Sequence, residues 1–94
     1  MANASNIQQR YTAGLRGFCF SDLSGANLTG ANLTGANLTR ADFYNAAIIA
    51  ANLTRADFTS TDLTRANLTG ANFTSTDLTR ANLTGALLSG VTAA

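Results

Sequence analysis

The stretch Ala26–Arg40, ANLTGANLTGANLTR, contains one five-residue unit three times in succession. Each unit consists of a small residue, an Asn or Asp, a large apolar residue and two further residues. The large apolar residue then returns at every fifth position from residue 23 to residue 88 without a gap. The series is Leu23, Leu28, Leu33, Leu38, Phe43, Ile48, Leu53, Phe58, Leu63, Leu68, Phe73, Leu78, Leu83 and Leu88.

A period of five fits neither a helix nor a continuous strand. Five residues of helix rotate a side chain by roughly 140°, which would scatter the leucines around the helix. In a strand, a five-residue step moves each leucine to the opposite face. The series can be buried if the chain turns a corner once per unit, so that Ala26 and Leu28 both point towards the axis of a closed coil. Coils of this kind would stack by backbone pairing, and the pattern therefore predicts a solenoid.

The repeat unit, as in Ala26-Asn27-Leu28-Thr29-Gly30, resembles that of the cyanobacterial-type pentapeptide-repeat proteins. The resemblance implies an all-β solenoid, a right-handed quadrilateral β-helix with about twenty residues per coil, and therefore three to four coils here. The residues alone leave a three-sided coil open, because Thr59–Ala71 recurs identically as Thr74–Ala86, fifteen residues later. We interpret this echo as a duplication of three repeats.

The ends of the chain depart from the repeat, and we divide the chain accordingly. Residues 1–17 are predicted to form an N-terminal capping segment with a short helix from Ser5 to Gly14, residues 18–90 the β-helix, and residues 91–94 a C-terminal tail. Ile7 and Tyr11 would share one side of the helix and cover the first coil, with Phe18 and Phe20 beneath them. The pattern Arg-Tyr-x-x-Gly-x-Arg-x-Phe at residues 10–18 also resembles the leader of many cyanobacterial relatives.

The composition bears on several function classes. The 94-residue chain has no His, Lys or Glu and a net charge of +1. A general acid or base is therefore missing, and we expect a non-enzymatic protein with no cofactor, no bound metal, and neither nucleic acid nor a membrane as partner. The single cysteine, Cys19, and the lack of a signal-peptide pattern predict a cytoplasmic location.

The five aspartates all precede the large apolar residue of their unit. In twenty-residue coils they would form two acidic ladders, one of Asp22, Asp42 and Asp62 and one of Asp57 and Asp77. We expect a solvated surface on which arginines at the corners neutralise them. The alternative comes from quinolone-resistance members of the family, which mimic DNA and bind a type II topoisomerase such as gyrase. The net charge of +1 argues against that role here.

Two further departures from the repeat indicate where a partner could bind. The unit around Ile48 carries unusual outward residues, and these form a candidate partner patch of Tyr44, Ala47, Ile49 and Ala50. The last coil lacks an evident cover, which suggests self-association through the C-terminal coil. The sequence therefore predicts a structural or protein-interaction scaffold whose biological role and protein partner are unknown. A truncated or engineered solenoid is a further alternative, suggested by the near-perfect repeats.

Overall fold

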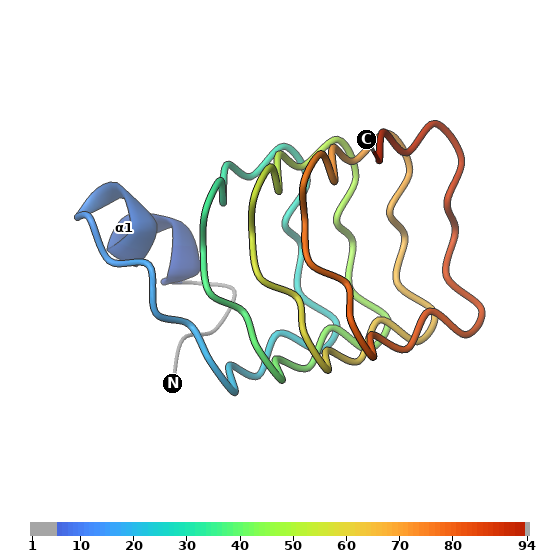
Figure 1. Cartoon of the computed structure of the whole chain (residues 1–94), viewed down its shortest axis with the longest axis horizontal. Helices are drawn as coiled ribbons and strands as arrows, with labels where there is room; N and C mark the ends of the chain where they lie inside the picture. Colours follow the sequence, from blue (N-terminus) through green and yellow to red (C-terminus); the bar gives the residue numbers. More distant parts are fainter. Residues whose placement is uncertain (1–5, 94) are drawn as a thin grey trace.

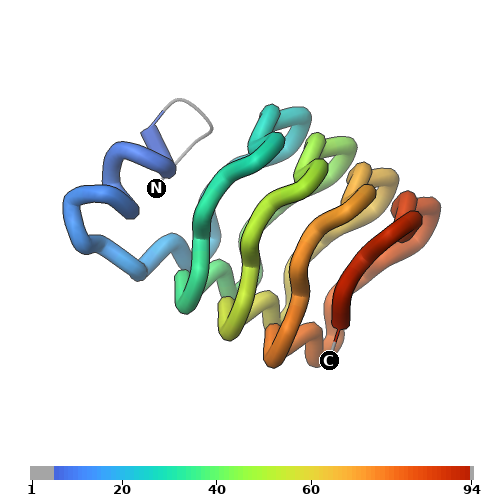
Figure 2. The backbone as a smooth tube through the Cα atoms, turned by 90° about the horizontal axis from the view of Figure 1, so that it is seen from above, coloured from blue at the N-terminus to red at the C-terminus, as the bar shows by residue number. Residues whose placement is uncertain are grey.

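The computed structural model describes residues 6–93, which form a stack of coils with one short helix at its N-terminal end (Figure 1). The helix, α1, spans Ile7–Thr12. Seen as a tube, the coils follow one another with a constant offset and α1 lies against the first of them (Figure 2). Among the described residues there is no strand of several residues. Neighbouring coils are joined instead by isolated parallel bridges, each of one residue pair.

The register of these bridges determines the number of sides. Each bridge joins residues twenty positions apart, such as Asp22 with Asp42 and Asn27 with Ala47. One coil therefore takes up four five-residue units, one for each side. The prediction of a four-sided coil is confirmed, and the three-sided alternative suggested by the fifteen-residue echo is wrong.

Each unit uses the same backbone hydrogen bonds. The N–H of Leu28 donates to the carbonyl of Ala47 in the next coil at 2.7 Å, and the N–H of Ala47 returns a bond to the carbonyl of Ala26 at 2.8 Å. At the corner the N–H of Ala31 donates to the carbonyl of Leu28 at 3.0 Å, with Gly30 at φ 71°. A positive φ at the third residue of a four-residue turn is the requirement of a type II turn, which explains glycine at many corners.

Not every corner is a glycine. Left-handed backbone at non-glycine residues costs roughly 1–2 kcal/mol each, and the repeats tolerate it because three inter-coil hydrogen bonds per unit hold the turn in place. The non-glycine residues with a positive φ are Phe20, Arg40, Asn45, Ala50, Arg55, Ser60, Arg65, Ser75 and Arg80.

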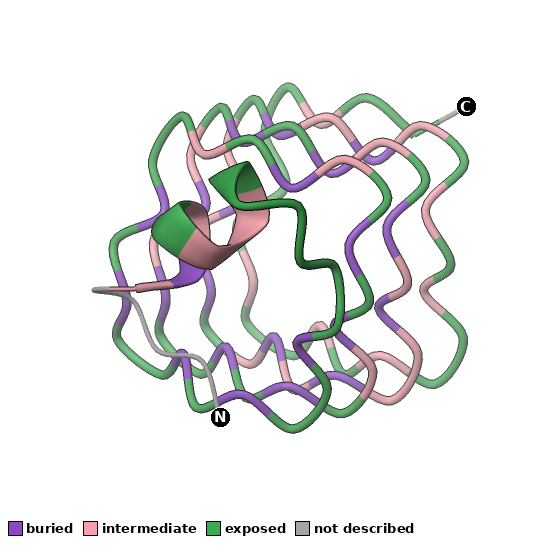
Figure 3. Cartoon of the chain, turned by 90° about the vertical axis from the view of Figure 1, so that its left-hand side faces the viewer, coloured by how far each residue is buried: buried purple, intermediate pink, exposed green. Residues whose placement is uncertain are grey.

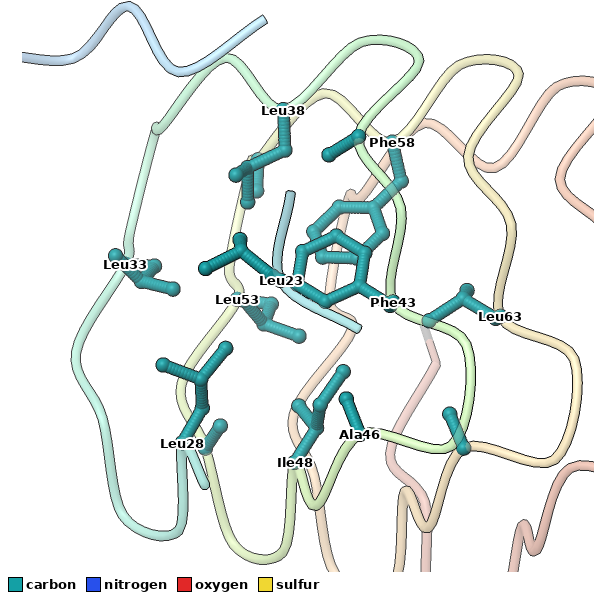
Figure 4. Close-up of a cluster of buried hydrophobic side chains, with 14 of the residues drawn as sticks. Leu23, Leu28, Leu33, Leu38, Phe43, Ala46, Ile48, Leu53, Phe58 and Leu63 are labelled. Carbon is teal, nitrogen blue, oxygen red and sulfur yellow. The ribbon is translucent and has the colours of Figure 1, made fainter. Parts of the chain in front are cut away.

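The axis of the β-helix is a buried apolar core with an aromatic stack in its middle. The rings of Phe43 and Phe58 stack at 5.2 Å between centroids, and Phe73 meets Phe58 edge-on at 5.7 Å. Figure 4 shows these two rings among the side chains of the core, which include Leu23 and Leu53. The three phenylalanines are fifteen residues apart, so each lies one coil further on and one side back. This spacing places successive rings close enough to stack or to meet edge-on.

Three inward positions hold a hydroxyl in place of alanine. Ser21 and Thr61 donate to the carbonyls of Phe18 and Phe58, three residues earlier in their own coil, at 2.7 and 3.0 Å. Only Thr76 reaches a neighbouring coil, where it donates to the carbonyl of Leu53 at 2.7 Å. Each hydroxyl is thus satisfied, as burial of a polar group requires.

Side chains of α1 close the N-terminal edge of the β-helix. The carboxamide of Gln8 donates to the carbonyl of Asn32 at 3.1 Å and accepts from the N–H of Asn32 at 3.0 Å. It therefore exchanges the same pair of bonds that a residue of a further coil would exchange. The hydroxyl of Tyr11 donates to the carbonyl of Thr34 at 2.7 Å, and Ile7 is fully buried beneath the helix. Figure 3 views this end, with α1 lying across the opening of the first coil.

Two details of this end differ from the sequence prediction. The helix begins at Ile7 after Asn6, which makes no capping bond through its side chain, and Ser5 lies outside the described residues. Phe18 is buried as expected, but Phe20 is 54% exposed and does not lie beneath α1. The reason is its place in the unit: Phe20 is the second residue after the inward Phe18, which is a corner with an outward side chain at φ 61°. The proposed division at residues 17 and 90 stays a prediction.

Candidate functional site

The aspartates of the two acidic ladders take part in the turns of the β-helix. The Oδ1 atom of Asp57 accepts from the backbone N–H of Thr59 at 3.0 Å and from its hydroxyl at 2.6 Å. Asn52 and Thr54 form the same pair of bonds at 3.1 and 2.7 Å. Because one acceptor oxygen is enough, Asn and Asp are interchangeable in this turn. Sequence reasoning missed this role, although the recurring Asn/Asp-Leu-Thr spacing was a signal for it.

The aspartates stand in columns along the molecule. Bridges join Asp22 to Asp42 and Asp42 to Asp62, with Asn82 next in that column, and a bridge joins Asp57 to Asp77 on the adjacent side. Like charges this close repel one another. At Asp57 the repulsion by Asp77 affects the pKa less than the local hydrogen bonds do.

Three of these carboxyl groups have a pKa below the ordinary value of 3.8. The hydroxyl of Thr59 and then its N–H lower the pKa of Asp57, while partial burial and the charge of Asp77 oppose the shift. Thr64 lowers the pKa of Asp62 and Thr79 that of Asp77 in the same way. Hydrogen bonding to the charged form thus dominates, and the carboxylates stay ionised at neutral pH.

The arginines do not neutralise the ladders by contact. Between residues 6 and 93 no arginine forms an ion pair with an aspartate, so neutralisation over longer distances stays a prediction. The physical reason is that the aspartate oxygens are directed back to their own turns while the arginines project from the corners. Several arginines lie over aromatic rings: Arg16 over Tyr11 at 3.7 Å, Arg40 over Phe20 at 5.6 Å and Arg10 over Phe18 at 5.8 Å.

The candidate partner patch is only partly open to solvent. Tyr44 is 41% exposed and Ala50 is exposed, whereas Ala47 and Ile49 are half-buried. The hydroxyl of Tyr44 lies 3.5 Å from a guanidinium nitrogen of Arg65 in the next coil, which donates to it. The role of this patch in binding a partner stays a prediction.

The C-terminal coil, residues 74–93, exposes the inside of the β-helix. Leu88 occupies an inward position but is 49% exposed, and its outward neighbour Leu87 is 56% exposed. Leu68, the equivalent residue one coil earlier, is fully buried. The backbone N–H groups of Leu78, Leu83 and Leu88 find no acceptor among the described residues, whereas that of Leu68 donates to the carbonyl of Leu87. This coil therefore presents a ring of apolar side chains and a row of unpaired donors.

No cavity is found in the part of the chain that the structure describes, and nowhere in residues 6–93 do three potential metal-binding side chains gather. Cys19 is exposed and forms no disulfide. No helix among the described residues is long and apolar enough to cross a bilayer.

Comparison with known proteins gives a consistent result. The family model for pentapeptide repeats matches eight copies, over residues 18–49 and 51–90. Three solved pentapeptide-repeat structures are similar. One from the Arabidopsis thaliana thylakoid lumen has 32% identity and a TM-score of 0.81 over 85% of this chain. A structure from the cyanobacterium Cyanothece 51142 has 30% identity and a TM-score of 0.58 over 83% of this chain. A structure from Nostoc PCC 7120 has 28% identity and a TM-score of 0.56 over 98% of this chain.

The matches also differ in length. The chain covers 56% of the Arabidopsis and Cyanothece structures and 97% of the Nostoc structure. A search of curated proteins found no significant match. The similar structures confirm the sequence-based assignment to this type of repeat and its right-handed quadrilateral β-helix.

One prediction is corrected by these comparisons. The expected cytoplasmic location is wrong, because the similar Arabidopsis protein belongs to the thylakoid lumen, which lies outside the cytoplasm. A single cysteine does not discriminate between compartments. A fold held by backbone hydrogen bonds and an apolar core, with one exposed cysteine, stands equally well in reducing and oxidising surroundings.

Proposed function

The chain belongs to the pentapeptide-repeat family, and from this premise we propose that it is a non-enzymatic scaffold that binds protein through the C-terminal coil of its β-helix. In this proposal residues 1–17 form the cap, residues 18–90 the scaffold of three to four coils, and residues 91–94 the tail. The partner is a second copy of the chain. The lack of His, Lys and Glu throughout the sequence supports the non-enzymatic assignment.

The observation that carries the proposal is the difference between the two ends of the β-helix. Gln8 and Tyr11 pair the backbone of Asn32 and Thr34 at the edge of the first coil, and Ile7 is fully buried in the core. At the other end Leu88 is half exposed, and the N–H groups of Leu78, Leu83 and Leu88 have no acceptor among residues 6–93. An open edge of this kind accepts a further strand from another chain, which satisfies its backbone and buries its apolar ring.

A second copy fits this surface because the surface complements itself. Two copies meeting coil to coil around a twofold axis would each supply backbone donors, backbone acceptors and an apolar ring. The coil carries two charged side chains, Asp77 and Arg80, which are of opposite sign. Charge repulsion therefore does not oppose the contact.

The test is the molar mass at increasing protein concentration, measured by sedimentation equilibrium. The wild type is expected to shift from monomer to dimer, and Leu88→Asp to remain monomeric because it places a charge in the apolar ring. Leu87→Asp is the matched control, since this residue is adjacent and equally exposed but points outward. A wild type that stays monomeric up to millimolar concentration, or equal loss of dimer in both variants, would refute the proposal.

The topoisomerase-binding alternative gains no support from the site. The carboxylates that would imitate phosphates are engaged in their own turns, and the net charge is +1. Lack of gyrase inhibition in a supercoiling assay at micromolar protein is the expected result.

A further inference from the structure

The N-terminal end of the molecule is basic although the whole chain is nearly neutral. Residues 6–21 contain two arginines, Arg10 and Arg16, and no acidic residue, which gives +2. Residues 22–93 contain four arginines and five aspartates, which gives 4 − 5 = −1. The expectation that no membrane is a partner depended on the average charge and on the lack of a spanning segment, and the average conceals this asymmetry.

Three arginines, Arg10, Arg16 and Arg40, each lie over an aromatic ring, and we call them together with Leu15 and Phe20 the N-terminal cluster. Arg16 covers the ring of Tyr11 and donates to the carbonyl of Leu15 at 3.1 Å. The N–H of Leu15 in turn donates to the carbonyl of Arg10, whose guanidinium lies over Phe18. Two residues further on, Phe20 lies under the guanidinium of Arg40. None of these guanidinium groups has an acidic partner among residues 6–93.

The cluster also exposes two large apolar side chains. Leu15 is 49% and Phe20 is 54% exposed, and Figure 3 shows the exposed segment that follows α1 crossing this end of the molecule. Phe20 has a left-handed backbone at φ 61°, which is unusual for a bulky residue. Neither its backbone strain nor its exposed ring is offset by burial in the core, so the position is costly for the isolated protein.

We propose that this N-terminal cluster binds the surface of an anionic lipid bilayer, with the β-helix approaching end-on. Phe20 and Leu15 enter the interface between headgroups and acyl chains, and the guanidinium groups of Arg10, Arg16 and Arg40 lie among the anionic headgroups. The proposal concerns the opposite end from the C-terminal contact and does not depend on it.

The charge distribution and the shape favour a bilayer over other anionic partners. A nucleic-acid duplex lying along the molecule would face the aspartate columns, which repel it, whereas a plane that meets the molecule end-on avoids most of them. An acidic peptide would need a groove to hold its side chains, and none is found among the described residues. A fluid interface needs no groove to bury an exposed phenylalanine.

The experiment is co-sedimentation of the full chain with two kinds of vesicle, phosphatidylcholine alone and phosphatidylcholine mixed with phosphatidylglycerol. Binding to the anionic vesicles is expected to be at least about tenfold tighter and to weaken with added salt. Phe20→Gly keeps the left-handed corner and removes the ring, and should weaken binding roughly tenfold. Arg40→Gln should weaken it about fivefold, as expected for one basic residue at an anionic surface.

Matched controls come from the other end of the same molecule. Arg80→Gln removes an arginine from the same column of corners as Arg40, and Leu87→Asn removes an exposed leucine. Both should change binding less than about twofold. Thermal unfolding of each variant verifies that the fold is intact.

Equal binding to the two vesicle types would overturn the proposal. The same holds if the control variants lose as much affinity for the anionic vesicles as the cluster variants do. Tighter binding to polyglutamate or to duplex DNA than to the anionic vesicles would also overturn it, and would assign the cluster to a peptide or nucleic-acid partner.

Discussion

Replacing Gln8 with methionine tests whether a single side chain serves as the missing coil at the N-terminal edge. Methionine has nearly the length and shape of glutamine but can neither donate to the carbonyl of Asn32 nor accept from its N–H, bonds of 3.1 and 3.0 Å. Each such bond contributes about 0.5–1.5 kcal/mol. Both lie at an exposed edge where water replaces part of the loss, so we expect Gln8→Met to lower the free energy of unfolding by about 1–2 kcal/mol.

Urea unfolding followed by circular dichroism measures this loss, and the midpoint should fall by roughly 1 M. Hydrogen exchange shows which backbone amides lose protection in the variant. The amide of Asn32 depends on Gln8 alone, whereas the amide of Asn52 donates to the carbonyl of Ala31 at 2.8 Å within the stack. Exchange at Asn32 should therefore accelerate about tenfold more than exchange at Asn52.

Gln9→Met is the matched control for this prediction. Gln9 is the next residue of α1, is exposed, and its side chain makes no hydrogen bond to the described coils. Gln9→Met should leave the free energy of unfolding nearly unchanged. If Gln8→Met and Gln9→Met differ by no more than a few tenths of a kcal/mol, or if exchange at Asn32 is unchanged, the carboxamide does not act as a substitute for backbone.

Three other changes test the corners, the turns and the core. Ala50→Gly should stabilise the protein by about 0.5–1 kcal/mol in urea unfolding, because glycine removes the left-handed strain at φ 57° but adds entropy to the unfolded chain; a loss of stability would contradict this account of the corner. Thr59→Val should raise the pKa of Asp57 in an NMR titration, because it removes the main donor to that carboxylate. Since the pKa of Asp57 is lower in the folded protein, its stabilising contribution is complete above pH 3.8 and is lost as the pH falls through the folded pKa; the variant should thus lose less stability on acidification. Phe58→Ala should cost about 3–5 kcal/mol, more than Leu28→Ala, because it interrupts the stack at its middle ring; equal midpoints in denaturant would show that the stack adds nothing beyond apolar burial.

The interior of this protein could be predicted from sequence because the inward positions obey one rule. Every unit needs a small inward residue directly after the corner and a large one at the axis, and this requirement is local, so Ala36 and Leu38 already specify their own burial. The number of sides did not follow from periodicity, since a five-residue unit is compatible with three or four sides. The register of the bridges decided it.

The surface was harder to predict, because the same residue serves two purposes. Asp57 was expected to face solvent as a ladder member, yet its oxygen closes a turn in the way that Asn52 does. Phe20 was expected in the core on hydrophobicity alone, but its place in the unit puts it at a corner. The pairing of Gln8 with Asn32 could not be foreseen, because a capping side chain outside the repeat shares no pattern with the coil that it closes.

A coil has twenty residues but the echo has a spacing of fifteen, so surface residues repeated by the echo follow a helical path around the β-helix. A segment copied after fifteen residues lies one coil further along the β-helix and one side, a quarter turn, back. The copy of Asp62 is accordingly Asp77, on the neighbouring side, next to Asp57. Adding three units at a time therefore winds a surface motif around the rod like a thread, whereas adding four units would stack it in a straight line. The length of an insertion in this protein thus determines which direction its new surface faces.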